Sequence, residues 1–393
     1  MSKEENLLNK ILWLYYTANA LAGIFLNVFL FTLGGFKATI TYNLIALISL
    51  YIFYVISAWS LRRFSSTQLI RFGLLAGSLC YLSVVILREQ AINYLIPLGI
   101  LAGAAAGNFW PGFNLSQFIL TEETSRHAFF GRQNFLGTIA NISGPLISGA
   151  IIGLSGILAT KLLGYTVVFS IVSIFMFFTF LEAAKLPEHK GVDFSVLHIF
   201  EHIRGRNWKI VLSQQFLNGF WDTSLGLIII ILIFVIVKQE FTLGLLNSLA
   251  GVVFAIANIM AIRILQKNRK SILLGMIFPP LGILIFFFMQ NFIGIIILVT
   301  LFYIFYPLID ITLKKSYFDT IDEAEGSWQN KYHFLIERET VLDLGRFATY
   351  LILFAFFTPT NQLQVAKAWL LVVPVLIFAV GILQFYRFKQ TPA

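Results

Sequence analysis

Long apolar stretches, separated by short polar and charged segments, make up most of this chain. A helix needs about 20 predominantly apolar residues to cross a hydrocarbon core that is about 30 Å thick. Helices are expected because lipid cannot satisfy a free backbone amide, whereas a helix satisfies its own. We therefore predict an all-α integral membrane protein with twelve spans, at 11–33, 39–61, 67–87, 93–118, 134–157, 162–181, 210–237, 243–265, 272–290, 293–313, 340–358 and 366–386.

The composition excludes the main soluble classes. Apolar residues make up 58% of the 393 residues and charged residues only 12%, whereas a soluble globular chain carries about 25% charged residues. Too little charge remains to cover a water-facing surface, which excludes a soluble enzyme, a nucleic-acid-binding protein and a disordered tail. The single Cys80 excludes an internal disulfide framework and a thiolate zinc site. We expect no cofactor, no resident metal and no cleavable signal peptide.

The distribution of basic residues predicts the orientation of the chain. Lys and Arg accumulate in cytoplasmic loops because they resist translocation. With the N-terminus inside, the inner segments hold 22 of the 28 Lys and Arg residues, the outer loops hold five, and Arg346 alone lies within a span. This asymmetry predicts a multi-pass protein of the cell (inner) membrane with both termini in the cytoplasm.

A long polar connection divides the twelve spans into two sets of six. Residues 182–209 carry Pro187, several charges and an amphipathic stretch that we interpret as a helix on the membrane surface. We predict an N-terminal six-helix bundle at 1–181, this linker at 182–209 and a C-terminal six-helix bundle at 210–393. The second long cytoplasmic connection is expected at 314–339.

The two halves resemble each other at equivalent positions. The fourth span contains Trp110-Pro111 and the tenth contains Tyr306-Pro307, and each pair is followed by polar residues and a charged cytoplasmic loop. Two repeats of six spans are typical of transporters in which two bundles face a central cavity.

Twelve spans in two sets of six, together with two short motifs, resemble the major facilitator superfamily of secondary transporters. The loop after the second span keeps the basic part of the family's motif in Arg62 and Arg63, without its Gly and Asp. Gly144-Pro145 in the fifth span is similar to the Gly-Pro motif that the family associates with export. The resemblance implies a major facilitator-like fold of two pseudo-symmetric bundles, in which the first, fourth, seventh and tenth helices line the cavity.

Polar residues recur at helical spacing within those same four spans. A polar side chain in a membrane usually faces a cavity or a partner, because exposure to lipid is costly. We therefore expect substrate contacts from Tyr15, Asn19, Trp110, Asn114, Gln117, Gln214, Asn218, Asp222, Tyr303, Tyr306 and Asp310. For a single Asn or Gln the alternative is a hydrogen bond that holds two helices together.

Charged residues inside the spans are candidates for proton coupling or gating. Asp222 has no basic residue in its own helix, so it must be paired, hydrated or protonated. Asp343 and Arg346 are three residues apart and can pair along one helix. The predicted set for coupling or gating is Asp222, Asp310, Asp343, Arg346 and Arg132.

These features predict a monomeric secondary active transporter that moves a polar or amphipathic organic solute by alternating access coupled to protons. It is not expected to be an enzyme or to bind nucleic acid. One alternative is a lipid or glycolipid flippase, with an apolar portal at the Phe-rich stretch 175–180. Another is a membrane-embedded transferase that holds a divalent cation at Asp319, Asp322, Glu323 and Glu325. The pair His198 and His202 has a spacing that could bind a metal, but it is typical of a solvated helix face.

Overall fold

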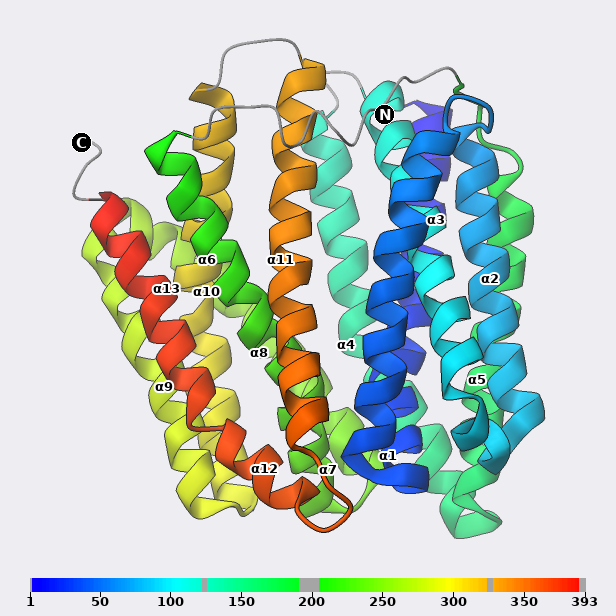
Figure 1. Cartoon of the computed structure of the whole chain (residues 1–393), viewed down its shortest axis with the longest axis vertical. Coiled ribbons are helices and arrows are strands. Elements are labelled where there is room, and N and C mark those ends of the chain that lie inside the picture. Colours follow the sequence, from blue (N-terminus) through cyan, green and yellow to red (C-terminus); the bar gives the residue numbers. More distant parts are fainter. Residues whose placement is uncertain (1, 122–125, 191–204, 324–327, 389–393) are drawn as a thin grey trace. The chain divides into compact units, whose positions relative to one another are not determined.

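The computed structural model describes residues 2–121, 126–190, 205–323 and 328–388, and within these ranges the chain contains helices and turns but no strand (Figure 1). The helices are α1 (Lys3–Ser60), α2 (Ser66–Leu87), α3 (Leu95–Leu120), α4 (Arg126–Leu158), α5 (Lys161–Ala183), α6 (Arg206–Thr223), α7 (Ile230–Val237), α8 (Glu240–Lys267), α9 (Ile272–Met289), α10 (Phe292–Glu323), α11 (Trp328–Phe356), α12 (Gln362–Trp369) and α13 (Val372–Phe388). Short 3₁₀ segments, η1 (Arg88–Tyr94) and η4 (Arg269–Ser271), precede α3 and α9, and a π-helical segment, η3 (Ser224–Ile229), joins α6 to α7.

The helices accommodate the twelve predicted crossings. Nine helical runs among the described residues are long and apolar enough to cross a membrane. Two of these runs are long enough for two crossings each: Lys3–Ser60 is interrupted at Gly34 and Gly35, and Ser66–Gln117 contains both α2 and α3. The polar helix α11 adds one more, since its 29 residues reach about 43 Å at 1.5 Å per residue.

Tight turns connect several crossings at the ends remote from the predicted cytoplasmic loops. Gly35 breaks α1 with a φ of 71°, a conformation that glycine adopts without steric cost. Lys238 and Gln290 cap α7 and α9 in the left-handed region, with φ of 55° and 41°. The short break that the sequence predicted at Gln290-Asn291 is therefore present, and the Asn291 side chain accepts a hydrogen bond from the Gly294 amide that starts α10.

One predicted loop and one predicted span differ from the boundaries expected from the sequence. Much of the loop expected at 314–339 is helical, because α10 continues to Glu323 and α11 starts at Trp328. Helix continues beyond the apolar run since a helix satisfies its own backbone in water as well as in lipid. The last predicted span, 366–386, is interrupted between Trp369 and Val372, which separates α12 from α13. The amphipathic stretch expected within 182–209 lies at residues 191–204, outside the described residues.

Two compact units account for the whole chain. Unit 1 consists of Met1–Val196 and Gln239–Ser248, and unit 2 of Leu197–Lys238 and Leu249–Ala393. The first turns of α8 therefore group with unit 1, although they follow the seventh span in sequence. Ser248 donates a hydrogen bond to the carbonyl of Ile142 in α4, and a methyl group at Gly244 would lie 2.2 Å from the Pro145 carbonyl oxygen.

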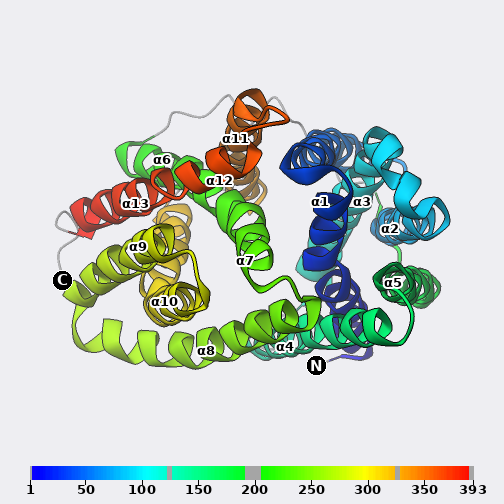
Figure 2. The same cartoon turned by 90° about the horizontal axis from the view of Figure 1, so that it is seen from below.

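Several helix pairs pack in equivalent ways in both units, which supports the internal repeat. In unit 1, α1 packs against α4, and α2 packs against α3 and α5. In unit 2, α6 packs against α11, and α9 packs against α10 and α13. Figure 2 shows α2 beside α3 and α5, and α13 beside α6 and α9.

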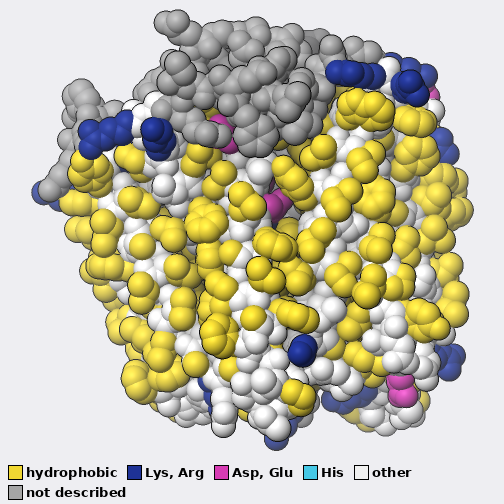
Figure 3. All heavy atoms as spheres, viewed as in Figure 1, with side chains coloured by type: hydrophobic (Ala, Val, Ile, Leu, Met, Phe, Trp, Pro, Cys, Tyr) yellow, Lys and Arg dark blue, Asp and Glu magenta, His cyan; other side chains and the backbone are white. Residues whose placement is uncertain are grey.

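The molecular surface has the polarity expected of a membrane protein. Hydrophobic side chains cover the middle of the face in Figure 3, whereas most Lys and Arg side chains lie near its ends. Exposed apolar side chains include Ile157, Leu158 and Phe288, each about four-fifths exposed. Acidic side chains are visible at only a few places within the hydrophobic band.

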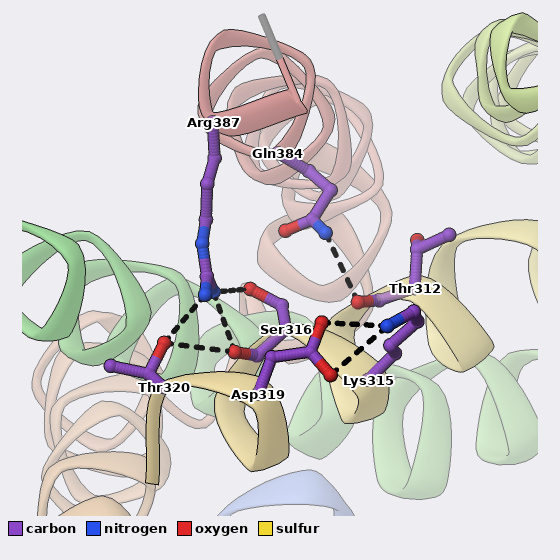
Figure 4. Close-up of polar contacts among 7 residues, drawn as sticks. All are labelled: Thr312, Lys315, Ser316, Asp319, Thr320, Gln384 and Arg387. Atoms are coloured by element: carbon purple, nitrogen blue, oxygen red, sulfur yellow. Dashed lines mark hydrogen bonds and ion pairs between the residues drawn. The ribbon is translucent and has the colours of Figure 1, made fainter. Parts of the chain in front are cut away.

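A buried arginine ties the end of α13 to α10 in unit 2 (Figure 4). Arg387 donates hydrogen bonds to the carbonyl and hydroxyl oxygens of Ser316 and to the Thr320 hydroxyl. One turn earlier, Gln384 donates to the Thr312 carbonyl oxygen at 3.0 Å. These bonds hold the two helices together near the ends that carry the charged residues.

Candidate functional site

A close helix crossing in unit 2 positions the candidate site. A methyl group at Gly219 in α6 would lie 2.1 Å from the Leu342 carbonyl oxygen. One at Gly345 in α11 would lie 2.1 Å from the Phe216 carbonyl oxygen. The two backbones are in direct contact, as small residues permit in membrane helices. Side chains one turn away on either helix can therefore meet.

Three charged side chains meet beside this crossing. The Arg346 guanidinium donates to Asp222 Oδ2 from Nη2 at 2.7 Å and from Nε at 3.1 Å. Its Nη1 donates to Asp343 Oδ1 at 3.0 Å, along α11. Hence the sequence-predicted pair on α11 and the isolated Asp222 of α6 form one cluster, which we call the ion triad.

The ion triad is only partly shielded from solvent. The side chain of Asp222 is 48% exposed, that of Arg346 is 34% exposed and that of Asp343 is 15% exposed. Two carboxylates share one guanidinium, so the triad carries a net charge of −1 when all three groups are ionised. Such an arrangement can take up or release a proton without separating every pair.

An aromatic cluster from α10 lies next to the triad. The Tyr306 ring contacts Trp221 edge-on at 4.8 Å between centroids and stacks on Phe302 at 5.1 Å. Tyr303 also contacts Phe302, at 5.4 Å. Asp310, one turn beyond Tyr306, is 19% exposed and pairs with Lys314 at 2.8 Å. Tyr306 of α10 therefore contacts α6 through Trp221, the residue before Asp222, within unit 2.

Two amides of the predicted α6 stripe have different surroundings. Gln214 is buried and donates to Gln384 of α13 at 2.7 Å, an arrangement that serves helix packing. Asn218 lies one turn before Asp222, and its Oδ1 is buried without a hydrogen-bond donor among the described residues. Asn218 therefore has an unused acceptor close to the ion triad, whereas the amide NH₂ of Gln214 is committed to Gln384 of α13.

In unit 1 the equivalent helices bring together aromatic rings and amides. The Tyr15 ring of α1 stacks on Phe109 of α3 with centroids 3.9 Å apart, and it contacts Trp110 edge-on at 5.8 Å. Asn19 donates to the Tyr15 carbonyl in its own helix. Asn114 is half-buried and has no hydrogen bond to any described residue.

Two further predicted residues of unit 1, Gln117 of α3 and Arg132 of α4, form hydrogen bonds to neighbouring helices. Gln117 accepts a hydrogen bond from Gln133 of α4 at 3.3 Å. Arg132, which the sequence suggested for gating, is exposed and donates to Asn6 at 2.6 Å. Arg132 thus links α4 to α1, and it is not part of an ion pair with a described carboxylate.

Sequence reasoning overlooked two residues that help to form these sites. Trp221 contributes a ring to the Tyr306 cluster, and Gln384 accepts the hydrogen bond by which Gln214 packs against α13. Both could have been singled out, since Trp221 is adjacent to Asp222 and Gln384 is a lone polar residue in an apolar span. Their partners, however, lie in other helices and have no signature in local spacing.

The described residues contain no group of three or more His, Cys, Asp and Glu side chains that could hold a metal ion. In the suggested transferase cluster, Asp319 forms an ion pair with Lys315 at 2.7 Å. The side chains of Asp322, Glu323 and Glu325 lie outside the described set, as do those of His198 and His202.

Comparisons with other sequences place the chain beside two bacterial proteins. No protein-family model matches it. The uncharacterized protein YqgE of Bacillus subtilis (strain 168) is 27% identical over 344 residues, which cover 86% of this chain and 79% of that protein. An uncharacterized protein in the sodM 3′ region of Geobacillus stearothermophilus is 28% identical over 197 residues, covering 49% of this chain and 87% of that one.

Solved structures of transporters match the whole chain. The POT family transporter PepTSo superposes with a TM-score of 0.77 at 11% identity, covering 99% of this chain and 98% of that one. The nucleoside transporter NupG gives 0.72 at 12% identity, with 99% and 100% covered. A bacterial homologue of the iron transporter ferroportin gives 0.70 at 12% identity, with both chains fully covered. The predicted major facilitator-like fold is therefore confirmed.

Proposed function

We propose that this chain, which has the major facilitator fold, is a secondary active transporter that moves an organic solute by alternating access and is coupled to protons. The observation that carries the proposal is the ion triad, because it joins Asp222 of α6 to Arg346 and Asp343 of α11 within the membrane-spanning helices. Charges at such depth are costly and are kept mainly where an ion or substrate must pass.

The shared guanidinium suggests how a proton could act on the conformation. When both carboxylates are ionised, Arg346 holds α6 and α11 together through Asp222. Protonation of Asp222 removes its charge and weakens the hydrogen bonds that it accepts, since charge-assisted bonds are about twice as strong as neutral ones. Arg346 then retains only Asp343, which lies on its own helix. Proton binding would thereby loosen the contact between α6 and α11.

The residues around the triad favour an organic cargo over a metal ion. The half-buried rings of Tyr303 and Tyr306 provide stacking surface, with the buried Trp221 packed against Tyr306, while Asn218 and the carboxylates provide hydrogen-bond acceptors. A transported divalent cation would be expected to meet several oxygen or nitrogen ligands at once. The described residues contain no group of three or more His, Cys, Asp and Glu side chains that could hold a metal ion.

Alternating access would come from rocking of the two six-helix units, as in transporters built from repeats. With six crossings in each half, the chain returns to the side on which it started, so both termini lie in the cytoplasm if the basic loops do. We further propose that the protein acts as a monomer in the cell membrane.

Transport in reconstituted vesicles tests the proposal. Thermal-shift screening of the purified chain against metabolites and drugs first identifies a ligand, because a compound that binds only the folded state raises its stability. Accumulation of that compound in proteoliposomes is then measured with and without an imposed pH gradient. We expect the gradient to drive accumulation by the native protein, and Asp222→Asn to lose at least about 90% of it while still exchanging substrate across the membrane at a saturating substrate concentration.

Asp319→Asn is the matched control. Asp319 also pairs with a basic residue, but it lies at the exposed end of α10. This variant is expected to accumulate substrate like the native protein. Gradient-driven accumulation that survives Asp222→Asn would remove the triad from the coupling mechanism. If no soluble compound is carried but a fluorescent phospholipid crosses the bilayer, the solute proposal is wrong and the flippase alternative is favoured.

A further inference from the structure

The ion triad has more hydrogen-bond acceptors than donors. Asp222 Oδ2 accepts both bonds that this residue receives from Arg346, and Asp222 Oδ1 receives none from the described residues. Asp343 likewise accepts only through Oδ1, which leaves its Oδ2 free of described donors. An arginine fork can serve both oxygens of one carboxylate, but here it is divided between two residues. One oxygen of each carboxylate is left for another donor.

Asn218 adds a third free acceptor on the same face of α6. It lies four residues before Asp222, which places the two side chains one turn apart. Its Oδ1 is buried and has no donor among the described residues. Leaving a buried acceptor unpaired costs about 1–3 kcal/mol, so a donor from a bound molecule would remove this cost.

The charges around the site are unbalanced towards the negative. Asp222, Asp343 and Asp310 contribute three carboxylates, and Arg346 is the cation that contacts two of them. Lys314 pairs with Asp310 at 2.8 Å and balances its charge, so the excess negative charge is the −1 of the ion triad. An anionic molecule at this place would meet net repulsion, whereas a cationic molecule would be attracted.

Aromatic rings form an apolar wall beside these acceptors. Tyr306 is central to the wall, since it contacts Trp221 and Phe302 and also stacks near Phe254 with centroids 6.3 Å apart. Tyr306 lies one turn before Asp310 on α10, and its edge-on partner Trp221 directly precedes Asp222 on α6. The faces of aromatic rings attract cations and also stack on other rings. The Tyr306 ring and the free acceptors of the ion triad therefore lie on neighbouring parts of α10, α6 and α11, where one small molecule could contact both.

We infer that the substrate is a protonated primary or secondary amine that carries an apolar ring. This inference rests on the proposed transport function and specifies the substrate class of the same site. The ammonium group donates its N–H bonds to the free oxygens of Asp222, Asp343 and Asn218, and the ring packs on the Tyr306 wall. N–H donors matter as well as charge, because the unpaired acceptors require hydrogen bonds.

Four small probes that share a phenyl ring test the inference. Binding of phenylethylammonium, 2-phenylethanol, phenylacetate and phenyltrimethylammonium to the purified full-length chain in lipid nanodiscs is measured by titration calorimetry. We expect phenylethylammonium to bind at least about tenfold more tightly than the neutral alcohol, and phenylacetate not to bind. The quaternary cation, which has charge but no N–H, should bind at least about fivefold more weakly than phenylethylammonium.

Variants connect that binding to the named residues. Asp222→Asn and Asp343→Asn should each weaken phenylethylammonium binding at least about tenfold, and Tyr306→Leu about fivefold. Tyr306→Phe, which keeps the ring, should lose less than Tyr306→Leu. Asp319→Asn serves again as the control with unchanged affinity. Because Asp222→Asn also alters the contact between α6 and α11, the Asp343→Asn result carries the test if the first variant misfolds.

The outcomes separate this inference from the proposed function. Equal binding of the alcohol or the carboxylate, or unchanged affinity in both Asp variants, would overturn the amine assignment. If the amine fails to bind while a different compound is accumulated by a pH gradient, transport stands and the substrate class is wrong. If the amine binds as expected but is never carried across proteoliposomes, the assignment stands and the transport proposal fails.

Discussion

The two units use the same helix pairings but place different chemistry at them. In unit 1, α4 crosses α1 where a methyl group at Gly144 would lie 2.7 Å from Ala20, and no ion pair is found beside that crossing in the described residues. In unit 2, α11 crosses α6 at Gly219 and Gly345 with the ion triad one turn away. Small residues are thus common to both crossings, whereas charged residues lie beside the crossing of unit 2 alone among the described residues.

This difference distinguishes the small-residue packing, which both units share, from the ion triad, which the packing does not need. Close packing of small residues holds the helices together in both units without charges. The ion pairs of unit 1, such as Lys10–Glu182 and Lys161–Glu240, lie at helix ends. Since unit 1 packs at this crossing without an ion pair among the described residues, the fold does not itself require the triad of unit 2, which leaves that triad available for the proposed coupling and substrate binding.

The largest expected effect comes from blocking the crossing in unit 2. Gly219→Leu forces a side chain into the Leu342 carbonyl, which cannot move without shifting α11. Overpacking of this kind typically costs about 1–3 kcal/mol or more, so the melting temperature should fall by about 5–10 °C. Gly23→Ala in α1, with open space around it, is the control and should leave the temperature unchanged. A tolerated Gly219→Leu would show that the crossing does not hold the unit together.

Removing the shared cation should have the next largest effect, and it should depend on pH. Arg346→Ala leaves Asp222 and Asp343 close together without a counter-charge, so the variant should lose about 1–3 kcal/mol of stability at pH 8. At pH 4, protonation of one carboxyl relieves the repulsion and the loss should shrink. Thermal unfolding at both pH values measures this difference. Adding Asp222→Asn to Arg346→Ala should restore part of the loss at pH 8, and a purely additive double variant would contradict the pairing.

The ion pair between the buried Glu240 and the exposed Lys161 of unit 1 tests whether a charge at a helix end also contributes to proton coupling. Glu240 is buried, and it accepts hydrogen bonds from Lys161 and from the Tyr165 hydroxyl. Glu240→Gln should cost about 1–2 kcal/mol through loss of charge-assisted bonds. Proteoliposome transport should nevertheless keep its response to a pH gradient. A loss of pH coupling as complete as that expected for Asp222→Asn would show that both units carry coupling charges.

The smallest expected change in stability concerns an amide of unit 1. Asn114 is half-buried and has no described partner, so Asn114→Ala should alter the unfolding free energy by less than about 0.5 kcal/mol. If α3 contributes to substrate binding, transport should still show a raised KM at unchanged thermal stability. Unaltered KM and kcat would restrict the binding residues to unit 2.

Much of the fold could be predicted from the sequence, because it depends on local patterns. Apolar runs long enough to cross a bilayer placed the helices within a few residues of their observed bounds, as for α2, α9 and α5. The aromatic-Pro pairs at Trp110 and Tyr306 revealed the repeat that the shared helix pairings support. Boundaries were missed where helix continues into water, as in α10, since hydropathy marks the membrane and not the end of hydrogen bonding.

The candidate site was predicted less completely, because its contacts join distant positions. Helical spacing selected Asp222, Asn218 and Gln214 as one stripe, yet Gln214 bonds to Gln384 of α13, 170 residues away. Spacing also selected Arg346 and Asp343 as a pair on one helix. Helical spacing within one span could not show that Arg346 also donates to Asp222, 124 residues earlier in the chain.

The sequence by itself determined that this chain lies in a membrane, where its helices run and which side chains are polar within them, because each depends on neighbours a few residues apart. Only the tertiary structure decided which of those polar groups are consumed by packing and which retain a free acceptor. That choice depends on helix pairs meeting at small residues such as Gly219 and Gly345, beside which carboxylate and guanidinium groups from remote segments come within hydrogen-bonding distance.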